Sequence, residues 1–260
     1  MNLMLTDRDT PSRILRHYDA EMRADPPPEP GVSRVWSGGV LRTTGAYHCI
    51  GYSTLAGADA DREIATQAAF FRTLGVALEW KLYGHDRPAD LGDRLARAGF
   101  VAEATEHLMV RDLQNGYFED LPPDGIDLRQ VRDPAGLADF AAAAGGAFGR
   151  DESRAIDAYG SRLADPTLAL LVAYDGHQPL AAGRLEMPSG RCFASLWGGG
   201  TVPGRRGRGL YRALVAARAW EALWHGYRYL TVDARETSRP ILQRLGFVEL
   251  TTVTGWVLRP

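Results

Sequence analysis

The part of the sequence that decides the fold is residues 201–211, TVPGRRGRGLY, in which glycines and arginines alternate. Residues 196–202, LWGGGTV, lead into it from apolar, strand-like positions through three consecutive glycines. Glycine lets a backbone approach a ligand closely, and the first turn of a helix presents unpaired N–H groups at the positive end of its dipole. The stretch therefore predicts a strand, an anion-binding loop and a helix, with a phosphate or pyrophosphate as the anion. A solvated glycine-rich turn is the plainer alternative.

The helix predicted after this loop is amphipathic and ends near Gly226, where a left-handed glycine cap is expected. Arg212, Arg218 and Glu221 are expected on its polar side. Its apolar residues recur at helical spacing, and they are Leu210, Ala213, Leu214, Ala217, Leu223 and Trp224.

Two nucleotide-binding interpretations fit this loop less well. It lacks the Gly-x-x-x-x-Gly-Lys-[Ser/Thr] pattern of a P-loop, and no lysine enters the helix. A dinucleotide-binding fold carries its glycine loop after the first strand, whereas residues 201–211 lie late in the chain.

Residues 202–211 resemble motif A of the GNAT superfamily, the acyl-CoA-dependent N-acyltransferases, whose signature is Q/R-x-x-G-x-G/A. Arg206 takes the first position and Gly209 the inner glycine, whereas Tyr211 stands where the family usually has Gly or Ala. The resemblance implies that backbone amides of the loop hold the pyrophosphate of acetyl-CoA and that the Gly200–Val202 segment supplies a donor to the oxyanion. The cofactor-binding residues that it implies are Gly200, Thr201, Val202, Arg206, Gly207, Arg208, Gly209, Leu210, Tyr211 and Ser238.

A second motif follows at a plausible spacing. Residues 227–232 are rich in aromatic and β-branched residues and predict a strand, and Pro240 lies in the first turn of a short helix that ends before Gly246. Residues 238–247, SRPILQRLGF, resemble motif B of the family, N-x-x-A-x-x-L-Y-x-K-L-G-F, with Arg235 in place of the Asn.

The main departure in motif B is Leu242, which replaces the family's Tyr. In many members that Tyr donates a proton to the departing CoA thiolate, and leucine has no proton to give. Ser238, Tyr211, Tyr229 and a bound water all remain possible donors. A thiol is a moderately acidic leaving group, so loss of the acid need not abolish turnover.

The reaction that the resemblance implies is transfer of an acetyl or other acyl group from CoA to a primary amine, by direct attack on the thioester. The amine must first lose its proton to a base or to water. Glu186 and Asp233 are the candidate bases, and they join Ser238 as candidate catalytic residues. For either acid, a solvated or salt-bridged side chain is the plainer alternative.

The first half of the chain repeats the order of elements of the second half. Residues 64–74 predict a helix, 77–83 a strand and 91–98 a helix that closes at a Gly-Phe pair, and a strand follows at 105–113. The same order, with the same Gly-Phe pair, spans 210–257. The chain is therefore expected to be an α/β (α+β) protein of two tandem GNAT-like domains, each a mixed, mostly antiparallel central sheet flanked by helices. An unrelated α/β domain in the first half is the alternative.

The domain boundary is predicted at residues 115–126, which are rich in Asn, Gly and Pro turn formers. Residues 1–114 then form a degenerate GNAT-like domain, and residues 127–260 form the acyl-CoA-binding N-acetyltransferase domain. The first domain is called degenerate because Asp59 and Asp61 stand where a pyrophosphate would have to bind, and like charges repel.

The composition predicts a cytoplasmic globular protein, with 45% hydrophobic and 24% charged residues. A net charge of −2 argues against a nucleic-acid partner, and no apolar run reaches the ~20 residues of a membrane span. Two cysteines suggest no disulfide framework, and no secretion signal is evident. The histidines show no metal-ligand spacing, so no metal is expected. His85 and Asp86 are interpreted as a loop pair that caps the next helix.

The sequence leaves the acceptor and the oligomeric state open. The expected partner is a small-molecule or peptide amine. Two other functions compete with the enzyme: a catalytically silent CoA-binding regulatory or scaffolding protein, and a nucleotide-phosphate module.

Overall fold

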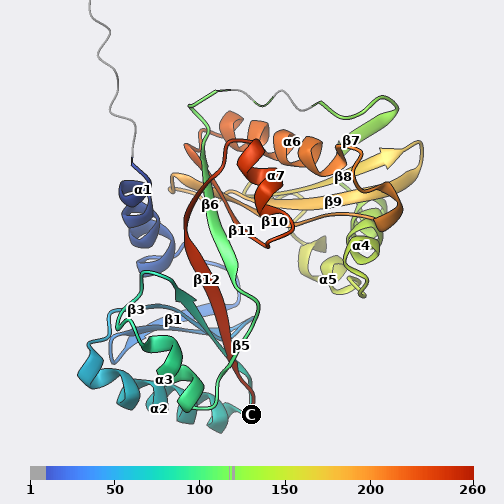
Figure 1. The fold of residues 1–260 in the computed structure, drawn as a ribbon. Helices are drawn as coiled ribbons and strands as arrows, with labels where there is room; N and C mark the ends of the chain where they lie inside the picture. The colour runs from blue at the N-terminus through green and yellow to red at the C-terminus, as the bar shows by residue number, and fades with distance from the viewer. Residues whose placement is uncertain (1–9, 117, 119–120) are drawn as a thin grey trace, which may run out of the picture. The chain divides into compact units, whose positions relative to one another are not determined.

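The computed structural model describes residues 10–116, 118 and 121–260 (Figure 1). The chain forms two compact units. Unit 1 contains the residues up to 108 together with 234–236 and 249–260, and unit 2 contains residues 109–233 and 237–248. The end of the chain thus returns to the unit in which the chain begins. The predicted linker at 115–126 stays a prediction.

Unit 1 is built on a sheet in which β1, β2, β3, β4 and β12 follow one another, with β5 also paired to β12. Neighbouring strands are antiparallel except for β3 and β4, which are parallel. Figure 1 shows α2 and α3 on one face of this sheet and α1 on the other. The elements are α1 (Pro11–Tyr18), η1 (Asp19–Ala24, a π-helix), β1 (Val32–Ser37), β2 (Val40–Gly45), β3 (Cys49–Ser53), α2 (Gly57–Leu74), β4 (Leu78–Tyr83), α3 (Leu91–Arg97), β5 (Val101–Ala102), β6 (Glu106–Asp112, which ends in unit 2) and β12 (Val248–Leu258).

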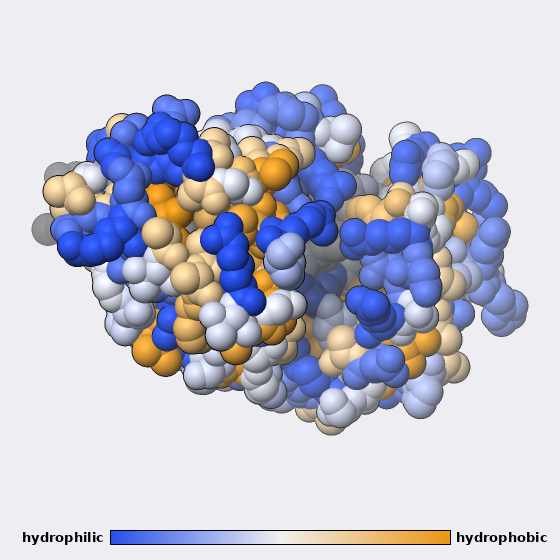
Figure 2. Space-filling model, turned by 90° about the horizontal axis from the view of Figure 1, so that it is seen from below, coloured by the Kyte–Doolittle hydropathy of each residue, from blue (hydrophilic) through white to orange (hydrophobic). Residues whose placement is uncertain are grey.

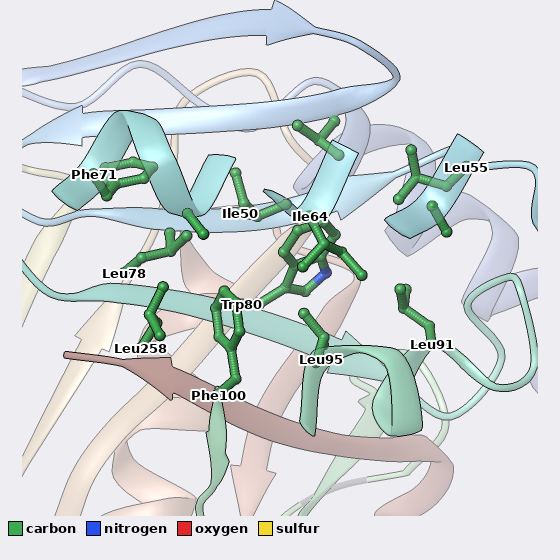
Figure 3. Packing of buried hydrophobic residues seen from close by; sticks show 13 residues of the cluster. Ile50, Leu55, Ile64, Phe71, Leu78, Trp80, Leu91, Leu95, Phe100 and Leu258 are labelled. Atoms are coloured by element: carbon green, nitrogen blue, oxygen red, sulfur yellow. The ribbon is translucent and has the colours of Figure 1, made fainter. Parts of the chain in front are cut away.

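The core of unit 1 fills the space between the sheet and helices α2 and α3 (Figure 3). Trp80 from β4 is its largest buried side chain, and Phe100 meets it edge-to-face at 6.4 Å between ring centroids. Leu258, two residues from the end of the chain, is 6% exposed and belongs to the same cluster. The last strand therefore contributes both backbone pairing and apolar burial to unit 1.

Unit 2 is built on a sheet in which β11, β10, β9, β8 and β7 follow one another. The β10–β11 pair is parallel and the other pairs are antiparallel. Helix α6 covers one face of this sheet, and α4 and α5 cover the other (Figure 1). The elements are β7 (Ile126–Gln130), α4 (Pro134–Phe148), α5 (Arg154–Gly160), β8 (Leu168–Asp175), β9 (Gln178–Glu186), β10 (Phe193–Thr201), the 3-10 turn η2 (Pro203–Arg205), α6 (Leu210–Trp224), β11 (Tyr229–Ala234) and α7 (Arg239–Arg244).

The predicted internal repeat is confirmed. Helix α2, strand β4 and helix α3 in unit 1 follow the same order as α6, β11 and α7 in unit 2. Each series closes on a glycine in the left-handed region, Gly99 at φ +93° and Gly246 at φ +80°, where a side chain would be strained. The next residue is a buried phenylalanine in both cases, Phe100 and Phe247. The expected mixed, mostly antiparallel sheets flanked by helices are also confirmed.

The surface shows hydrophilic side chains interspersed with hydrophobic ones on the face drawn in Figure 2. Across the described ranges, none of the helices combines the length and the apolar character that a membrane crossing requires. Even the 18-residue helix α2 buries an acidic side chain, that of Glu63.

Replacing Leu258 by alanine tests the assignment of the last strand to unit 1. We expect Leu258→Ala to lower the free energy of unfolding by about 2–4 kcal/mol, because a buried leucine is lost from a packed core. Arg259→Ala, at the adjacent exposed position, is the control and should change it by less than about 0.5 kcal/mol. Urea unfolding followed by tryptophan fluorescence measures both. Equal stability of the two variants would show that the end of the chain is not part of this core.

Candidate functional site

The candidate site lies where β10 parts from β11. The parallel pairing joins Phe193–Ser195 to Tyr229–Thr231, and among the described residues it stops there. Strand β10 continues to Thr201, held on its other side by β9 through a bulge between Trp197 and Gly200. Past the last pair, none of the described strands lies beside this edge of β10, so its N–H groups need partners, while the Thr201 carbonyl accepts from Arg206. Such an edge suits a ligand that carries amide groups of its own.

The three glycines of the bulge are required by backbone conformation at Gly198 and by packing at Gly199 and Gly200. Gly198 has a φ of +55°, in the left-handed region. A Cβ on Gly199 would lie 3.0 Å from Arg218 Nη2, and one on Gly200 would lie 2.8 Å from the Ala147 Cβ. The sequence suggested that another molecule approaches the backbone here. In the structure, side chains of α6 and α4 make that approach.

The loop that follows is shaped by two left-handed glycines. Gly207 has a φ of +75° and Gly209, the residue before α6, a φ of +85°. No side chain caps α6, and no acidic residue lies in its first turn. Over the part of the chain that the structure describes, the backbone amides of residues 207–211 have no hydrogen-bond acceptor. The start of α6 thus offers five unsatisfied N–H groups to an anion.

The arginines of the loop have different surroundings. The guanidinium of Arg206 donates to the carbonyl oxygens of Thr201 (3.1 Å) and Ala147 (2.9 Å), so it fastens the loop to β10 and α4. Arg205 forms an ion pair with Asp175 at 3.2 Å. Arg208 is exposed and makes no hydrogen bond or ion pair with any described residue, so its charge is available to a ligand.

The ring of Tyr211 is directed away from the loop amides. A Cβ on Gly199 would lie 3.1 Å from its Cε2 atom, which places the ring against the bulge of β10. Its phenol is hydrogen-bonded to the hydroxyl of Ser238, the residue before α7. Burial raises the pKa of the Tyr211 phenol, while the charge of Arg218 and the Ser238 hydrogen bond oppose that rise. The amide of Tyr211 therefore remains accessible although the usual Gly or Ala is replaced.

The burial of Arg218 is the feature of the candidate site that the sequence pattern did not reveal. Arg218 was expected on the polar side of α6, yet its side chain is only 1% exposed and packs against the sheet. The reverse holds for Trp224, which was expected on the apolar side and is 87% exposed. The spacing of Arg218, four and eight residues from Leu214 and Leu210, was the available signal, since these three positions share one helix face.

The buried guanidinium of Arg218 is satisfied by carbonyl oxygens. It donates to those of Leu214 (3.0 Å), Arg184 (3.0 Å) and Trp197 (3.5 Å). It forms no ion pair with a carboxylate of the described residues. Burial lowers the pKa of Arg218 to about 10, so the side chain stays charged at neutral pH. An uncompensated positive charge thus lies beneath the bulge of β10.

The candidate bases lie in ordinary polar surroundings. Glu186, at the end of β9, is half-buried and forms an ion pair with Arg184 at 3.3 Å, and the Arg184 guanidinium lies over the rings of Tyr159 and Trp197. Asp233, near the end of β11, is half-buried. Both acids stay candidate bases only as a prediction.

The candidate proton donors differ in burial and in their hydrogen-bond partners. Leu242 is fully buried in α7. Its side chain has no ionisable proton, so it cannot act as the acid. The ring of Tyr229 is also buried, stacked on Phe193 with 4.9 Å between centroids. Ser238 and Tyr211 are bonded to each other beside the β10 bulge.

The candidate oxyanion donors differ in the direction of their amides. The Val202 amide donates to the carbonyl of Leu180 at 2.9 Å and is committed to β9. Since successive amides of a strand point to opposite neighbours, the Thr201 amide points to the side where β10 has left β11. Thr201 is the residue of the Gly200–Val202 segment that best suits the role.

The pair His85 and Asp86 in unit 1 does not cap the following helix, so that interpretation is wrong. His85 Nε2 lies 2.7 Å from a carboxylate oxygen of Asp19, and Asp86 accepts two hydrogen bonds from Arg23. Asp90, the residue before α3, makes no side-chain cap either. The buried Arg23 forms ion pairs with Asp19 and Asp86, so this cluster has a structural role.

Comparison with known proteins identifies the fold. No protein-family model and no curated protein matches the sequence. Among solved structures, the chain is similar to a GCN5-related N-acetyltransferase from Kribbella flavida (TM-score 0.69, 17% identity, 87% of this chain and 89% of that one). It is also similar to one from Sphaerobacter thermophilus (0.64, 14%, 88% and 76%) and to a tandem GNAT protein from the clavulanic acid biosynthesis pathway (0.63, 12%, 88% and 83%). The chain has the GNAT fold in its tandem arrangement, and the predicted resemblance is confirmed at the level of the fold.

Gly183→Ala tests the burial of Arg218. A Cβ at Gly183 would lie 2.6 Å from Arg218 Cζ, so the buried guanidinium would have to shift away from the carbonyl oxygens that accept its hydrogen bonds. We expect the free energy of unfolding to fall by about 1–3 kcal/mol, the usual cost of overpacking. Gly204→Ala is the control, because a Cβ there meets nothing within 4 Å and φ is not positive. If thermal unfolding finds the two variants equally stable, the guanidinium does not lie beneath Gly183.

Proposed function

We propose that unit 2 is an N-acyltransferase that moves an acetyl or other acyl group from acyl-CoA to a primary amine. The observation that carries the proposal is the row of amides at residues 207–211, without acceptors, at the start of α6 in a chain of GNAT fold. These amides and the charge of Arg208 would hold the CoA diphosphate. Gly200, Thr201 and Val202 would line the path of the acyl group, and Ser238 would flank it. The acceptor would be a primary amine of a small molecule or a peptide.

The proposed reaction requires a hydrogen-bond donor to the oxyanion, a base for the amine and a proton for the thiolate. The Thr201 amide would donate to the thioester oxygen as negative charge develops on it, which is worth most where the donor is fixed in advance. The amine must attack in its neutral form, and Glu186, Asp233 or water would take its proton. The carbon–nitrogen bond forms as the carbon–sulfur bond breaks, so the thiolate also needs a proton.

The two units have different parts in this proposal. Unit 2, which holds most of the predicted domain 127–260, would form the transferase, and unit 1, which holds most of residues 1–114, a domain that has lost its ligand loop. The beginning of α2 in unit 1 supports this view, because Asp59 and Asp61 lie in its first two turns and pair with Arg62 and Arg94. A diphosphate would have to displace these ion pairs and meet two carboxylates.

A catalytically silent CoA-binding protein is the second candidate. The burial of Leu242, which leaves the usual acid position without a proton, and the pairing of Glu186 with Arg184 favour it. The two candidates agree on CoA and differ on turnover.

Thiol release separates the candidates. Incubating the full chain with acetyl-CoA and a broad panel of primary amines should release CoA thiol above background with at least one amine, because a fixed oxyanion donor lowers the barrier to attack. Saturable CoA binding without release over the whole panel would support the silent protein. ATP should compete with CoA only weakly. Competition by ATP at comparable affinity would instead identify a nucleotide-phosphate site.

Gly209→Glu tests the anion site. A carboxylate at the start of α6 repels a diphosphate, so the Kd for CoA should rise at least tenfold, or about 1.4 kcal/mol. Gly209→Ala is the control, since it carries the same strain at φ +85° without the charge. Isothermal titration calorimetry measures both, with the melting temperature as a check on folding. If the glutamate variant binds CoA as tightly as the alanine variant, CoA does not bind at this loop.

A further inference from the structure

A three-residue cluster lies between α6, α7 and the bulge of β10, and the sequence motifs do not predict that its members meet. Its members are Tyr211, Ser238 and Arg218. We propose that the Tyr211 phenol is the proton donor to the departing CoA thiolate, in place of the residue lost at Leu242. The inference rests on the proposed function and names a residue of that same site.

The position of the ring supports this role. The Tyr211 Cε2 atom would lie 3.1 Å from a Cβ on Gly199, so the phenol lies against the backbone just before Gly200 and Thr201. Of these two, Thr201 carries the candidate oxyanion donor, because its amide points to the edge of β10 that has left β11. A thioester sulfur is bonded to the same carbon as the carbonyl oxygen. A donor beside this segment is therefore also beside the leaving group.

The surroundings of the phenol stabilise the charge that proton donation creates. The Ser238 hydroxyl is hydrogen-bonded to the phenol, and it can donate a charge-assisted bond once the phenol oxygen is a phenolate. The guanidinium of Arg218 is fully buried, and its bonded acceptors are neutral carbonyl oxygens. In a buried setting a cation strongly favours a nearby anion. Tyr211 is thus a neutral phenol at rest with support for a transient phenolate.

The step balances without any further reactant. The amine nitrogen forms a bond to the carbonyl carbon, the carbon–sulfur bond breaks, and the electron pair of that bond goes to sulfur. The phenol proton passes to the thiolate and leaves a phenolate. The new nitrogen carries one proton too many, and that proton returns through water to the phenolate. The products are the amide and the free thiol of CoA, and Tyr211 is neutral again.

Tyr211→Phe tests this role with little disturbance, because it removes one oxygen and keeps the packing of the ring. We expect kcat to fall about 10- to 100-fold, the low end for acid catalysis with a leaving group that is already acidic. The Kd for CoA should stay within about twofold of wild type. The solvent deuterium isotope effect on kcat should shrink towards unity, which a purely structural role would not cause. Tyr227→Phe is the control, because its phenol donates to the carbonyl oxygen of Pro188 at 3.0 Å and has no part in the proposed step, and it should keep the wild-type kcat and isotope effect.

The possible outcomes separate this inference from the proposed function. Wild-type kcat and isotope effect in Tyr211→Phe would overturn the role of the phenol and leave the transferase intact. A Tyr211→Ala variant that binds CoA more tightly and turns over faster than wild type would also overturn it, by showing that the ring obstructs the site. A wild-type chain that binds CoA and releases no thiol with any amine would overturn both proposals.

Discussion

The parting of β10 from β11 after Ser195 is the constraint on which the rest of the site depends. Two parallel strands that stay paired leave no exposed backbone edge, whereas strands that separate inside a sheet need something to hold them apart. Here the bulge between Trp197 and Gly200 turns the end of β10, and the buried guanidinium of Arg218 ties α6 to the carbonyls of β9 and β10 at that point. The start of α6, with its free amides, is thereby fixed beside the open edge.

Burying an arginine without a carboxylate is costly, and the surrounding sequence shows how the fold accommodates it. Two glycines, Gly183 and Gly199, provide the space, and three carbonyl oxygens provide the hydrogen bonds. A buried cation that has no fixed counter-charge raises the local potential, which suits a site where negative charge must form on an oxygen and then on a sulfur. Arg218 thus joins α6 to the sheet and also supplies positive charge beside the proposed site.

Much of this could be predicted from the sequence, because the signals are local. The glycines that must adopt positive φ, Gly209 and Gly246, and the repeated Gly-Phe corners identify where helices begin and end without knowledge of the fold. The burial of Arg218 could not be predicted with the same ease, because a charge in a helix is ordinarily a sign of its solvent-facing side. The reason for Gly199 could not be predicted either, since the side chains that crowd it, those of Tyr211 and Arg218, come from a helix that begins only at Leu210. The place of Leu258 in the core of unit 1 depends on a strand pairing over more than 170 residues, which periodicity does not encode.

A crystal structure of the full chain with CoA bound tests most directly whether the amides of residues 207–211 hold the diphosphate. If CoA binds as proposed, its diphosphate oxygens lie about 2.7–3.2 Å from the amide nitrogens of residues 207–211, and the pantetheine amides lie along the free edge of β10. A complex in which CoA binds elsewhere, while those amides contact only water, would contradict the proposal.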